Sequence, residues 1–257
     1  MTVIIDNTEI LKQLEKEQKS LADLKKKKLL FAPFWDDFKM RLCWSSNLLE
    51  GNTLDLEETI EIIQYDEVRS GHTYQEYTEA KNLYRAIEEQ ISSDKTDITE
   101  EWIKRCNALI IGTNGEYRKK DVYIGTIAEA AYFPPGHEKV EEEMNQIMKQ
   151  AEIMGNDLES IIKKTAEFHI KFERIHPFSD GNGRTGRMIL NQQLINNDML
   201  PIAIEKTSKY RQAFRLYDKS ADISMLIHLI CNNELKAIDR VKELERKLVK
   251  RNKQIKR

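Results

Sequence analysis

The chain has 257 residues, of which 33% are charged and 40% hydrophobic, and its formal net charge is −2. This composition predicts an ordinary globular protein with a sizeable buried core, and it excludes a disordered chain. The small net charge excludes a strong whole-molecule attraction to nucleic acid or acidic membranes. Cys43, Cys106 and Cys231 form no CxxC pair, so they predict reduced thiols rather than a zinc site.

The chain shows no targeting or membrane signal. Its start, MTVIIDNTEI, has neither a basic region nor a long apolar stretch, so it does not resemble a signal peptide. No apolar run approaches the length of a membrane span. We therefore expect a cytoplasmic protein.

Most of the sequence has helical periodicity, and it holds only ten glycines and five prolines. A charged helix with regularly spaced leucines is predicted between Glu9 and Leu30, and a second helix from about 33 to 50. Gly51 suits a left-handed cap after that helix. Asp55, with Glu58 three residues on, resembles a capping box that starts a new helix. Further helices are expected at about 74–91, 98–112, 138–154, 156–174, 184–198, 207–219 and from 222 to near the end.

One insert breaks the helical rhythm. Residues 117–135, YRKKDVYIGTIAEAAYFPP, collect β-forming residues around Gly125 and end in two prolines. They predict a short β-hairpin, whose free edge could pair with an extended peptide. A lone hairpin is marginal in water, so it must lean on the helices. On these residues alone, a plain connecting loop is an equal alternative.

The expected architecture is all-α with this one small hairpin. We divide the chain into an N-terminal helical region at 1–95, a core at 96–205 and C-terminal helices at 206–257, packed as one compact unit. The basic C-terminal stretch, DRVKELERKLVKRNKQIKR, lacks interleaved aromatic residues. It therefore fits a solvated helix end better than a nucleic-acid patch.

Residues 176–187, HPFSDGNGRTGR, predict an anion-binding turn that leads into a helix. Gly181 and Gly183 permit backbone angles that aim successive N–H groups into one concavity. The positive end of the following helix would point at the same place. Arg184 and Arg187 are three residues apart, so both can reach phosphate oxygens.

Two further side chains complete this turn. Asp180 is placed to hold a Mg²⁺ ion, and His176 suits a general base because it titrates near neutral pH. Each residue alone has a plainer interpretation as a cap, a turn or a solvent-exposed pair, but their combination within twelve residues favours a phosphate site. No GxxxxGK[ST] pattern occurs, so the chain is not a P-loop protein.

The segment HPFSDGNGRTGR resembles the signature of Fic-domain proteins, HPFx[DE]GNGRxxR, and every fixed position matches. The likeness continues through AEFHIKFERI upstream, through ILNQQLINNDMLPI downstream and to Lys209-Tyr210. It covers about residues 33–235. The resemblance implies the Fic helical fold, with the 117–135 insert as the flap on which a target protein docks.

The resemblance also implies a protein adenylyltransferase, which transfers AMP from ATP to a Ser, Thr or Tyr hydroxyl of a target protein, and of itself. Mg²⁺ would assist and pyrophosphate would leave. His176 would deprotonate the hydroxyl, and Asp180 would bind Mg²⁺. The nucleotide-binding residues would be Gly181, Asn182, Gly183, Arg184, Arg187 and, on the base side, Tyr210. Phe178 would anchor the loop in the core.

A second resemblance concerns residues 46–51, SNLLEG, which match the inhibitory motif [ST]xxxE[GN] of self-restrained Fic proteins. Ser46 and Glu50 lie four residues apart and share one helix face. By that likeness, Glu50 would pair with Arg187 and occupy the γ-phosphate position. Glu50 could also help a water remove AMP from a modified protein, and the sequence leaves the two roles open.

Two positions depart from the family pattern, and one histidine allows two interpretations. Arg211 stands where relatives often have a second tyrosine, and Asp218 where some have asparagine. Both leave the adenine side less defined than the phosphate side. His169, seven residues before His176, could suggest a two-histidine metal site. Without a third ligand, it fits a core or supporting histidine better.

Several alternatives remain from the sequence. A de-AMPylase or a two-way enzyme is the first, and other family members use UTP, CDP-choline or the γ-phosphate of ATP. A helical adaptor that keeps the fold is a non-enzyme alternative, although its motif residues should then be lost. Nucleic-acid binding is not expected. Residues 1–30 would form an extra helix, a mobile arm or a dimer contact, which makes a homodimer a candidate assembly.

Overall fold

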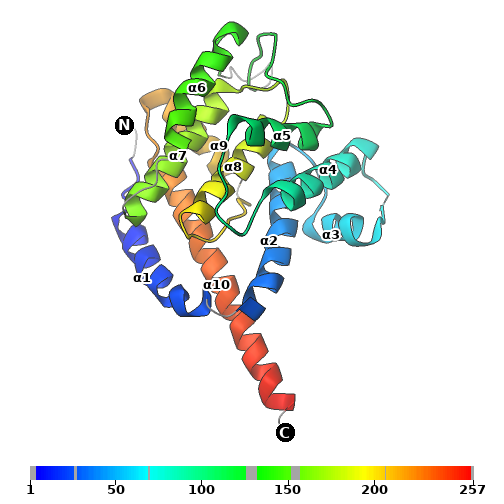
Figure 1. Ribbon diagram of the computed structural model, residues 1–257, viewed down its shortest axis with the longest axis vertical. Coiled ribbons are helices and arrows are strands. Elements are labelled where there is room, and N and C mark those ends of the chain that lie inside the picture. The colour runs from blue at the N-terminus through cyan, green and yellow to red at the C-terminus, as the bar shows by residue number, and fades with distance from the viewer. Residues whose placement is uncertain are drawn as a thin grey trace.

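The computed structural model describes residues 4–25, 28–68, 70–125, 132–151, 157–205 and 207–255, and within them the chain is helical with no sheet (Figure 1). The all-α prediction is confirmed. The helices are α1 (Thr8–Lys25), α2 (Lys28–Leu49), α3 (Leu56–Tyr65), α4 (Tyr74–Gln90), α5 (Glu100–Ile111), α6 (Val140–Ala151), α7 (Leu158–Ile175), α8 (Asn182–Asn196), α9 (Thr207–Ser220) and α10 (Ser224–Ile255), with a 3₁₀ turn, η1, at His137–Lys139.

Helices α7 and α8 form the centre of the molecule, and each is buried on two sides. On α7, Phe168 and Phe172 face one hydrophobic cluster, which also includes side chains of α2 to α6. Ile170 on the same helix and Leu194 on α8 face a second cluster, shared with α1, α9 and α10. The loop between α7 and α8 is therefore fixed at both ends by core packing.

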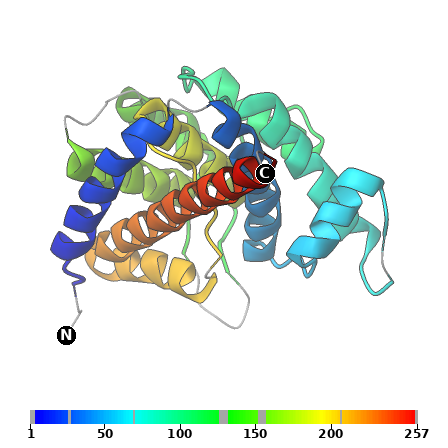
Figure 2. The ribbon, with the colours of Figure 1, turned by 90° about the horizontal axis from the view of Figure 1, so that it is seen from below.

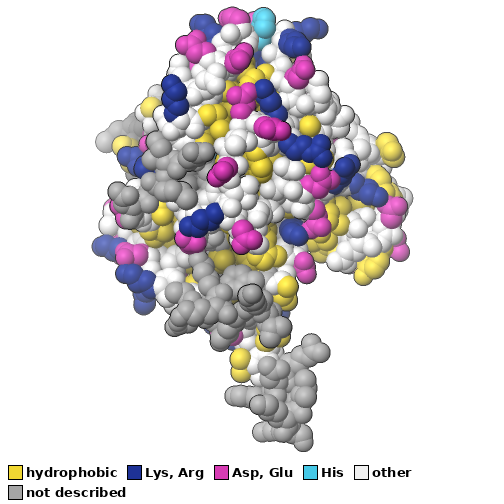
Figure 3. Space-filling model, in the orientation of Figure 1, with side chains coloured by type: hydrophobic (Ala, Val, Ile, Leu, Met, Phe, Trp, Pro, Cys, Tyr) yellow, Lys and Arg dark blue, Asp and Glu magenta, His cyan; other side chains and the backbone are white. Residues whose placement is uncertain are grey.

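The outer helices wrap this pair. α10 runs across the molecule beside α1 and extends past the body at its C-terminal end (Figures 1 and 2). α2 packs against α3, α4, α8 and α10, and α3 and α4 project to one side. On the face shown in Figure 3, basic and acidic side chains are interspersed, which fits the small net charge. No helix among the described residues is long and apolar enough to cross a membrane.

The helix boundaries agree with the expected ones to within a few residues, except where the first two helices meet: α1 ends at Lys25 rather than near Leu30, and the start of α2 also differs. The capping box of Asp55 and Glu58 is present, so that prediction is confirmed. α2 begins at Lys28 rather than near 33, and Pro33 lies inside it. Proline suits the first turn of a helix, which favoured the later start. Burial of Phe34 and Phe38 stabilises the helix on the C-terminal side of the proline.

The predicted hairpin at 117–135 is not seen as a pair of strands. One isolated antiparallel bridge joins Ile124 to Tyr132, with the Ile124 N–H donating to the Tyr132 carbonyl at 2.9 Å. The tip, residues 126–131, lies outside the described residues. Among the residues that the structure describes, no third strand or sheet lies beside this segment, and a two-stranded ribbon alone is only marginally stable.

The base of this insert is instead held by Arg118. Its side chain is fully buried, and the guanidinium donates to four backbone carbonyls. One of them is the carbonyl of His176, at 2.9 Å from Nε. The Arg118 N–H also donates to the Pro177 carbonyl at 2.9 Å. The insert is thus joined to the α7–α8 loop through backbone acceptors.

Candidate active site

The loop between α7 and α8 is closed on itself by hydrogen bonds. Asn182 accepts from the Phe178 N–H at 2.8 Å and donates to the Phe178 carbonyl at 2.8 Å. Phe178 is 1% exposed and packs against the ring of Tyr117. His176 adopts a left-handed conformation (φ 51°, ψ 60°) that ends α7. A positive φ is uncommon for a residue other than glycine, and here it turns the chain from the helix into the loop.

The N-terminus of α8 is open to an anion. Gly181, at the N-cap, has φ of 75° and no side chain of its own to cap the helix, while Asp180 Oδ1 accepts from the Gly181 N–H at 2.5 Å. A Cβ at Gly181 would lie 2.8 Å from Ile111, so both the backbone angle and the packing require glycine. Asn107 donates to the Asp180 carbonyl at 2.8 Å and holds the turn from α5. Uncapped N–H groups and the helix dipole together favour a phosphate here.

Glu50, at the end of α2, reaches into this site and pairs with Arg187. Its Oε1 lies 2.6 Å from Arg187 Nη2. Arg187 also donates to the Ser46 hydroxyl at 2.7 Å and to the Ser46 carbonyl at 2.9 Å. The Arg187 side chain is 3% exposed and that of Glu50 is 38% exposed. Burial opposes ionisation of Glu50, but the charge and hydrogen bond of Arg187 outweigh it and lower the carboxyl pKa.

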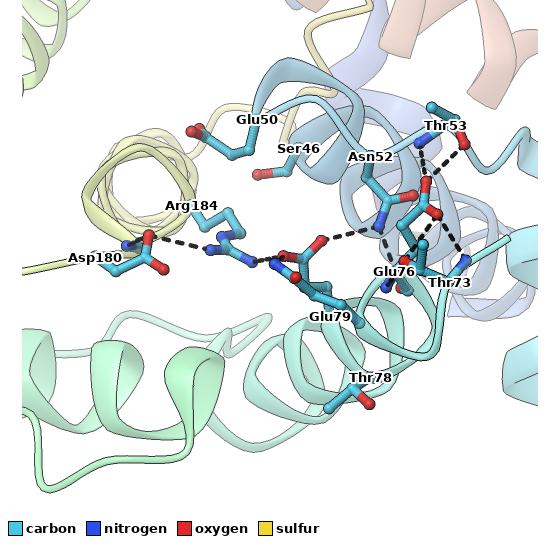
Figure 4. Close-up of polar contacts among 12 residues, drawn as sticks. Ser46, Glu50, Asn52, Thr53, Thr73, Glu76, Thr78, Glu79, Asp180 and Arg184 are labelled. Carbon is cyan, nitrogen blue, oxygen red and sulfur yellow. Dashed lines mark hydrogen bonds and ion pairs between the residues drawn. The ribbon is translucent and has the colours of Figure 1, made fainter. Parts of the chain in front are cut away.

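Arg184 lies between two carboxylates (Figure 4). Its Nη2 donates to Asp180 at 3.4 Å, and its Nη1 is 3.8 Å from Glu79 on α4. Asn52, two residues after Glu50, donates to the other oxygen of Glu79 at 3.0 Å. The buried Nε of Arg184 has no hydrogen-bond partner within the described chain. Arg184 is therefore held loosely and keeps a free donor.

The environment of His176 suits a proton acceptor. Its Nδ1 lies 3.3 Å from the Glu173 carbonyl, and donating there leaves Nε2 free to accept a proton, a tautomer inferred from the network. Burial lowers the pKa of the imidazole, while the Glu173 carbonyl and the charge of Glu50 raise it in part. The net lowering keeps the ring neutral near pH 7.

Two buried side chains, Tyr210 and His169, form a hydrogen-bonded chain that ends on Arg187. The Tyr210 hydroxyl accepts from Arg187 Nη1 at 3.4 Å and lies 2.7 Å from His169 Nε2. His169 Nδ1 lies 3.1 Å from the Gly186 carbonyl. Burial lowers the pKa of His169 to about 3, so the ring is neutral. His169 is thus a core histidine, as expected, and Tyr210 contacts the arginine from inside. A role for Tyr210 at the nucleobase stays a prediction.

The two departures from the family pattern both have partners. Arg211 Nη2 donates to the Leu49 carbonyl at 3.3 Å, so it contacts the end of the helix that carries Glu50. Asp218 accepts two hydrogen bonds of 2.7 Å from Arg174. The position of Arg211 is favourable, because the dipole of α2 attracts a cation to its C-terminal end.

The residues present fit a magnesium-bound triphosphate. Mg²⁺ is commonly held by one or two protein carboxylates, phosphate oxygens and waters. The Asp180 side chain is 71% exposed at the mouth of the turn, which leaves it available for this. Gly183 has no side chain, and a Cβ at this position would lie only 2.1 Å from Glu50 Oε1, so glycine leaves room for an acidic group beside α8. The free Arg184 Nε and the uncapped α8 terminus supply donors for phosphate oxygens.

Sequence reasoning missed several residues that shape the site. Arg118, Asn107 and Glu79 each contact it from helices or loops far away in the chain. Asn107 lies in a helical pattern as one polar residue among apolar neighbours, and that was its only signal. Glu79 resembles any charged residue on a solvated helix face, and Arg118 lies in a basic run.

Known proteins resemble this chain in sequence. Residues 97–194 match the model of the Fic/DOC family. A protein adenylyltransferase Fic from Aedes aegypti is 29% identical over 171 residues, and one from Drosophila melanogaster is 28% identical over 200 residues. These stretches cover 63% and 74% of this chain but only 33% and 39% of the relatives. The chain thus spans between a third and two fifths of these relatives' length.

Solved structures share the fold. A Fic domain containing signaling protein from Bacteroides thetaiotaomicron has a TM-score of 0.79 at 23% identity, covering 92% of this chain and 97% of that one. Fic-1 from C. elegans (residues 134–508) has a TM-score of 0.74 at 20% identity, covering 94% and 73%. The segment that matches the Fic/DOC family model, residues 97–194, includes the whole α7–α8 loop.

Proposed function

We propose that the chain is a protein adenylyltransferase that transfers AMP from ATP to a Ser, Thr or Tyr hydroxyl of a target protein, and of itself. The observation that carries the proposal is the turn before α8. There, His176, the exposed Asp180 and an uncapped helix end with two arginines converge within one closed loop. The adenylyltransferase relatives support this reaction over other uses of a phosphate site.

In the proposed reaction, His176 Nε2 accepts the proton of the target hydroxyl as its oxygen attacks the α-phosphorus. The bond to the β-phosphate oxygen breaks and pyrophosphate leaves. Asn182 and the N–H groups at 181–183 would hold the α- and β-phosphates, and Arg184 and Arg187 the β- and γ-phosphates. Mg²⁺ on Asp180 would neutralise phosphate charge. Placement and charge neutralisation supply most of the catalysis in such transfers.

Glu50 is proposed as the brake on this reaction, because it occupies Arg187 in the structure. Removing one partner of a fully buried ion pair costs about 3–5 kcal/mol, whereas exposed pairs contribute about 0–1 kcal/mol. Glu50 is 38% exposed, so we place the contribution of its pair between these limits, at about 1–3 kcal/mol. That range corresponds to roughly five- to 150-fold in activity.

The test compares wild type, Glu50→Gly, Glu50→Gln and Glu50→Gly/His176→Ala, each with Mg²⁺ and α-labelled ATP. We expect strong labelling of the enzyme and of added proteins with Glu50→Gly, faint labelling with wild type and none with the double variant. Glu50→Gln keeps the side-chain volume but loses the charge, so it should lie in between. If Glu50→Gly binds ATP yet labels no protein, AMP transfer is the wrong reaction.

A second candidate is removal of AMP from a modified protein. Glu50 is partly exposed and interacts electrostatically with His176, so it could orient a water in the same site. Release of AMP from a pre-modified protein by wild type, and its loss in Glu50→Gly, would favour this activity.

The partners follow from the same proposal. A target would dock by extended pairing near the Ile124–Tyr132 bridge, where backbone contacts carry little sequence specificity. A homodimer, a cytoplasmic location and the three-part division of the chain stay predictions.

A further inference from the structure

Glu173 is a buried carboxylic acid for which the proposed reaction has no use. It lies on α7, three residues before His176, and is only 8% exposed. Its Oε1 has no hydrogen-bond partner within the described part of the chain. A Cβ at Gly186 would lie 2.6 Å from that oxygen, so the carboxyl rests directly against α8, next to Arg187. An unpartnered buried polar atom is uncommon in folded proteins and often marks a functional position.

The groups that face Glu173 come from four helices. They are Arg174 and His169 on α7, Arg187 on α8, Glu50 at the end of α2 and Tyr210 on α9. Burial raises the pKa of Glu173 to about 7; the charge of Arg187 lowers it and that of Glu50 raises it. The pKa of Glu173 therefore depends in part on whether the charge of Glu50 is nearby.

We infer that Glu173 is a second counter-charge for Arg187, which keeps its proton while Glu50 is paired with that arginine and releases the proton to solvent when Glu50 withdraws. The inference rests on the proposed function, in which Glu50 must release Arg187 before the γ-phosphate of ATP can take its place. With Glu50 in place, a second negative charge in this buried site is repelled. With Glu50 gone and no nucleotide bound, Arg187 would be a buried, unpaired cation, which is strongly unfavourable.

This coupling gives the brake a pH dependence. Glu50 favours the protonated form of Glu173, so by reciprocity ionised Glu173 disfavours the closed position of Glu50. The closed state is thus favoured below the pKa of Glu173 and weakened above it. Glu173 touches neither nucleotide nor target in this scheme. It is a positioning residue that keeps Arg187 in place during the exchange between Glu50 and a phosphate.

The first test follows the proton by infrared spectroscopy and needs no transferase activity, so its outcome is independent of the proposed reaction. We expect a buried carboxylic-acid C=O band that titrates near pH 7 in the wild type and is absent from Glu173→Gln. In Glu50→Gly, the same band should titrate lower by about one pH unit. A missing wild-type band, or an unchanged titration in Glu50→Gly, overturns the inference.

The second test follows the end of α2 by hydrogen exchange of the backbone amides at 46–53, corrected for intrinsic exchange. Between about pH 6 and about pH 8, wild-type protection should fall roughly three- to tenfold, and that fall should disappear in Glu173→Gln. Glu159→Gln, which removes an exposed acid from the same helix, is the matched control and should keep the wild-type slope. A purely structural Glu173 would change protection equally at every pH, and that result overturns the inference.

Discussion

The α7–α8 loop and the end of α2 meet in one site, but they differ in how well their buried polar groups are hydrogen-bonded. In the loop, Asn182 satisfies both backbone groups of Phe178. At the end of α2, the buried side chains of Ser45 and Asn47 have no hydrogen-bond partner in the described part of the molecule. Each such group costs about 1–3 kcal/mol, part of which is recovered when water reaches it. We therefore expect the loop to keep its position, and the end of α2 to be the segment that moves more easily.

The largest expected effect comes from breaking the closed loop. Asn182→Ala leaves the Phe178 N–H and carbonyl buried without partners, which should lower the free energy of unfolding by about 2–4 kcal/mol. AMP transfer should fall more than tenfold, even in a Glu50→Gly background. Urea unfolding and α-label transfer measure the two effects. Asn197→Ala, which removes a hydrogen bond at the far end of α8, is the control and should retain transfer. Unchanged stability in Asn182→Ala would remove the contrast between the two regions.

A smaller effect is expected from Ser46→Ala, which removes the acceptor of the 2.7 Å bond from Arg187 Nε. Loss of one hydrogen bond to a charged group should loosen the brake and raise transfer about three- to tenfold. Ser45→Ala is the matched control, because it deletes a buried hydroxyl that has no partner within the described residues. It should leave transfer unchanged or lower it. If both variants activate equally, the Ser46 bond is not part of the brake.

The proton acceptor should also respond to the brake. The charge of Glu50 raises the pKa of His176, so Glu50→Gly should lower it further below the ordinary value of about 6.5. Since only the neutral ring accepts a proton, transfer is lost as pH falls through this pKa, and the acid limb should move to lower pH. Histidine-ring NMR titration of wild type and Glu50→Gly measures the shift, with the His176→Ala spectrum assigning the signal. A shift to higher pH would contradict the electrostatic coupling.

The smallest effect is expected at Arg211, whose bond to the Leu49 carbonyl is long, at 3.3 Å, and lies at the surface. Arg211→Gln should weaken the hold on the end of α2 by a few tenths of a kcal/mol and raise transfer about twofold or less. Arg215→Gln, which removes the same charge one turn further along α9, is the matched control for Arg211→Gln. A tenfold activation by Arg211→Gln would mean that the end of α2 is held mainly from outside the site.

The sequence could predict what lies within a short stretch of chain. The helices follow from periodicity and caps, and His176, Asp180 and both arginines fall within twelve consecutive residues. The residues of the second motif, Ser46 and Glu50, lie in one turn of helix, so their shared direction was also predictable. The structure brings them to Arg187, far along the chain.

What the sequence could not provide depends on contacts between distant segments. The buried position of Glu173 arises only when α2, α8 and α9 close around α7, and the charge itself gives no hint of burial. Glu79 reaches Arg184 only through the packing of α4. The 117–135 insert has strong β propensity, but its described residues form only the Ile124–Tyr132 bridge, because local preference alone does not supply a neighbouring strand layer.

The absence of a side chain at Gly183 restricts how this site can vary. A Cβ there would lie 2.1 Å from Glu50 Oε1 and 2.9 Å from Arg187 Nη1. An alanine at this position would therefore force the Glu50 carboxylate and the Arg187 guanidinium to shift, and it would disturb their ion pair in one step. Graded variation among descendants of this chain would have to arise in the surrounding positions, where one hydrogen bond can be gained or lost without blocking the site.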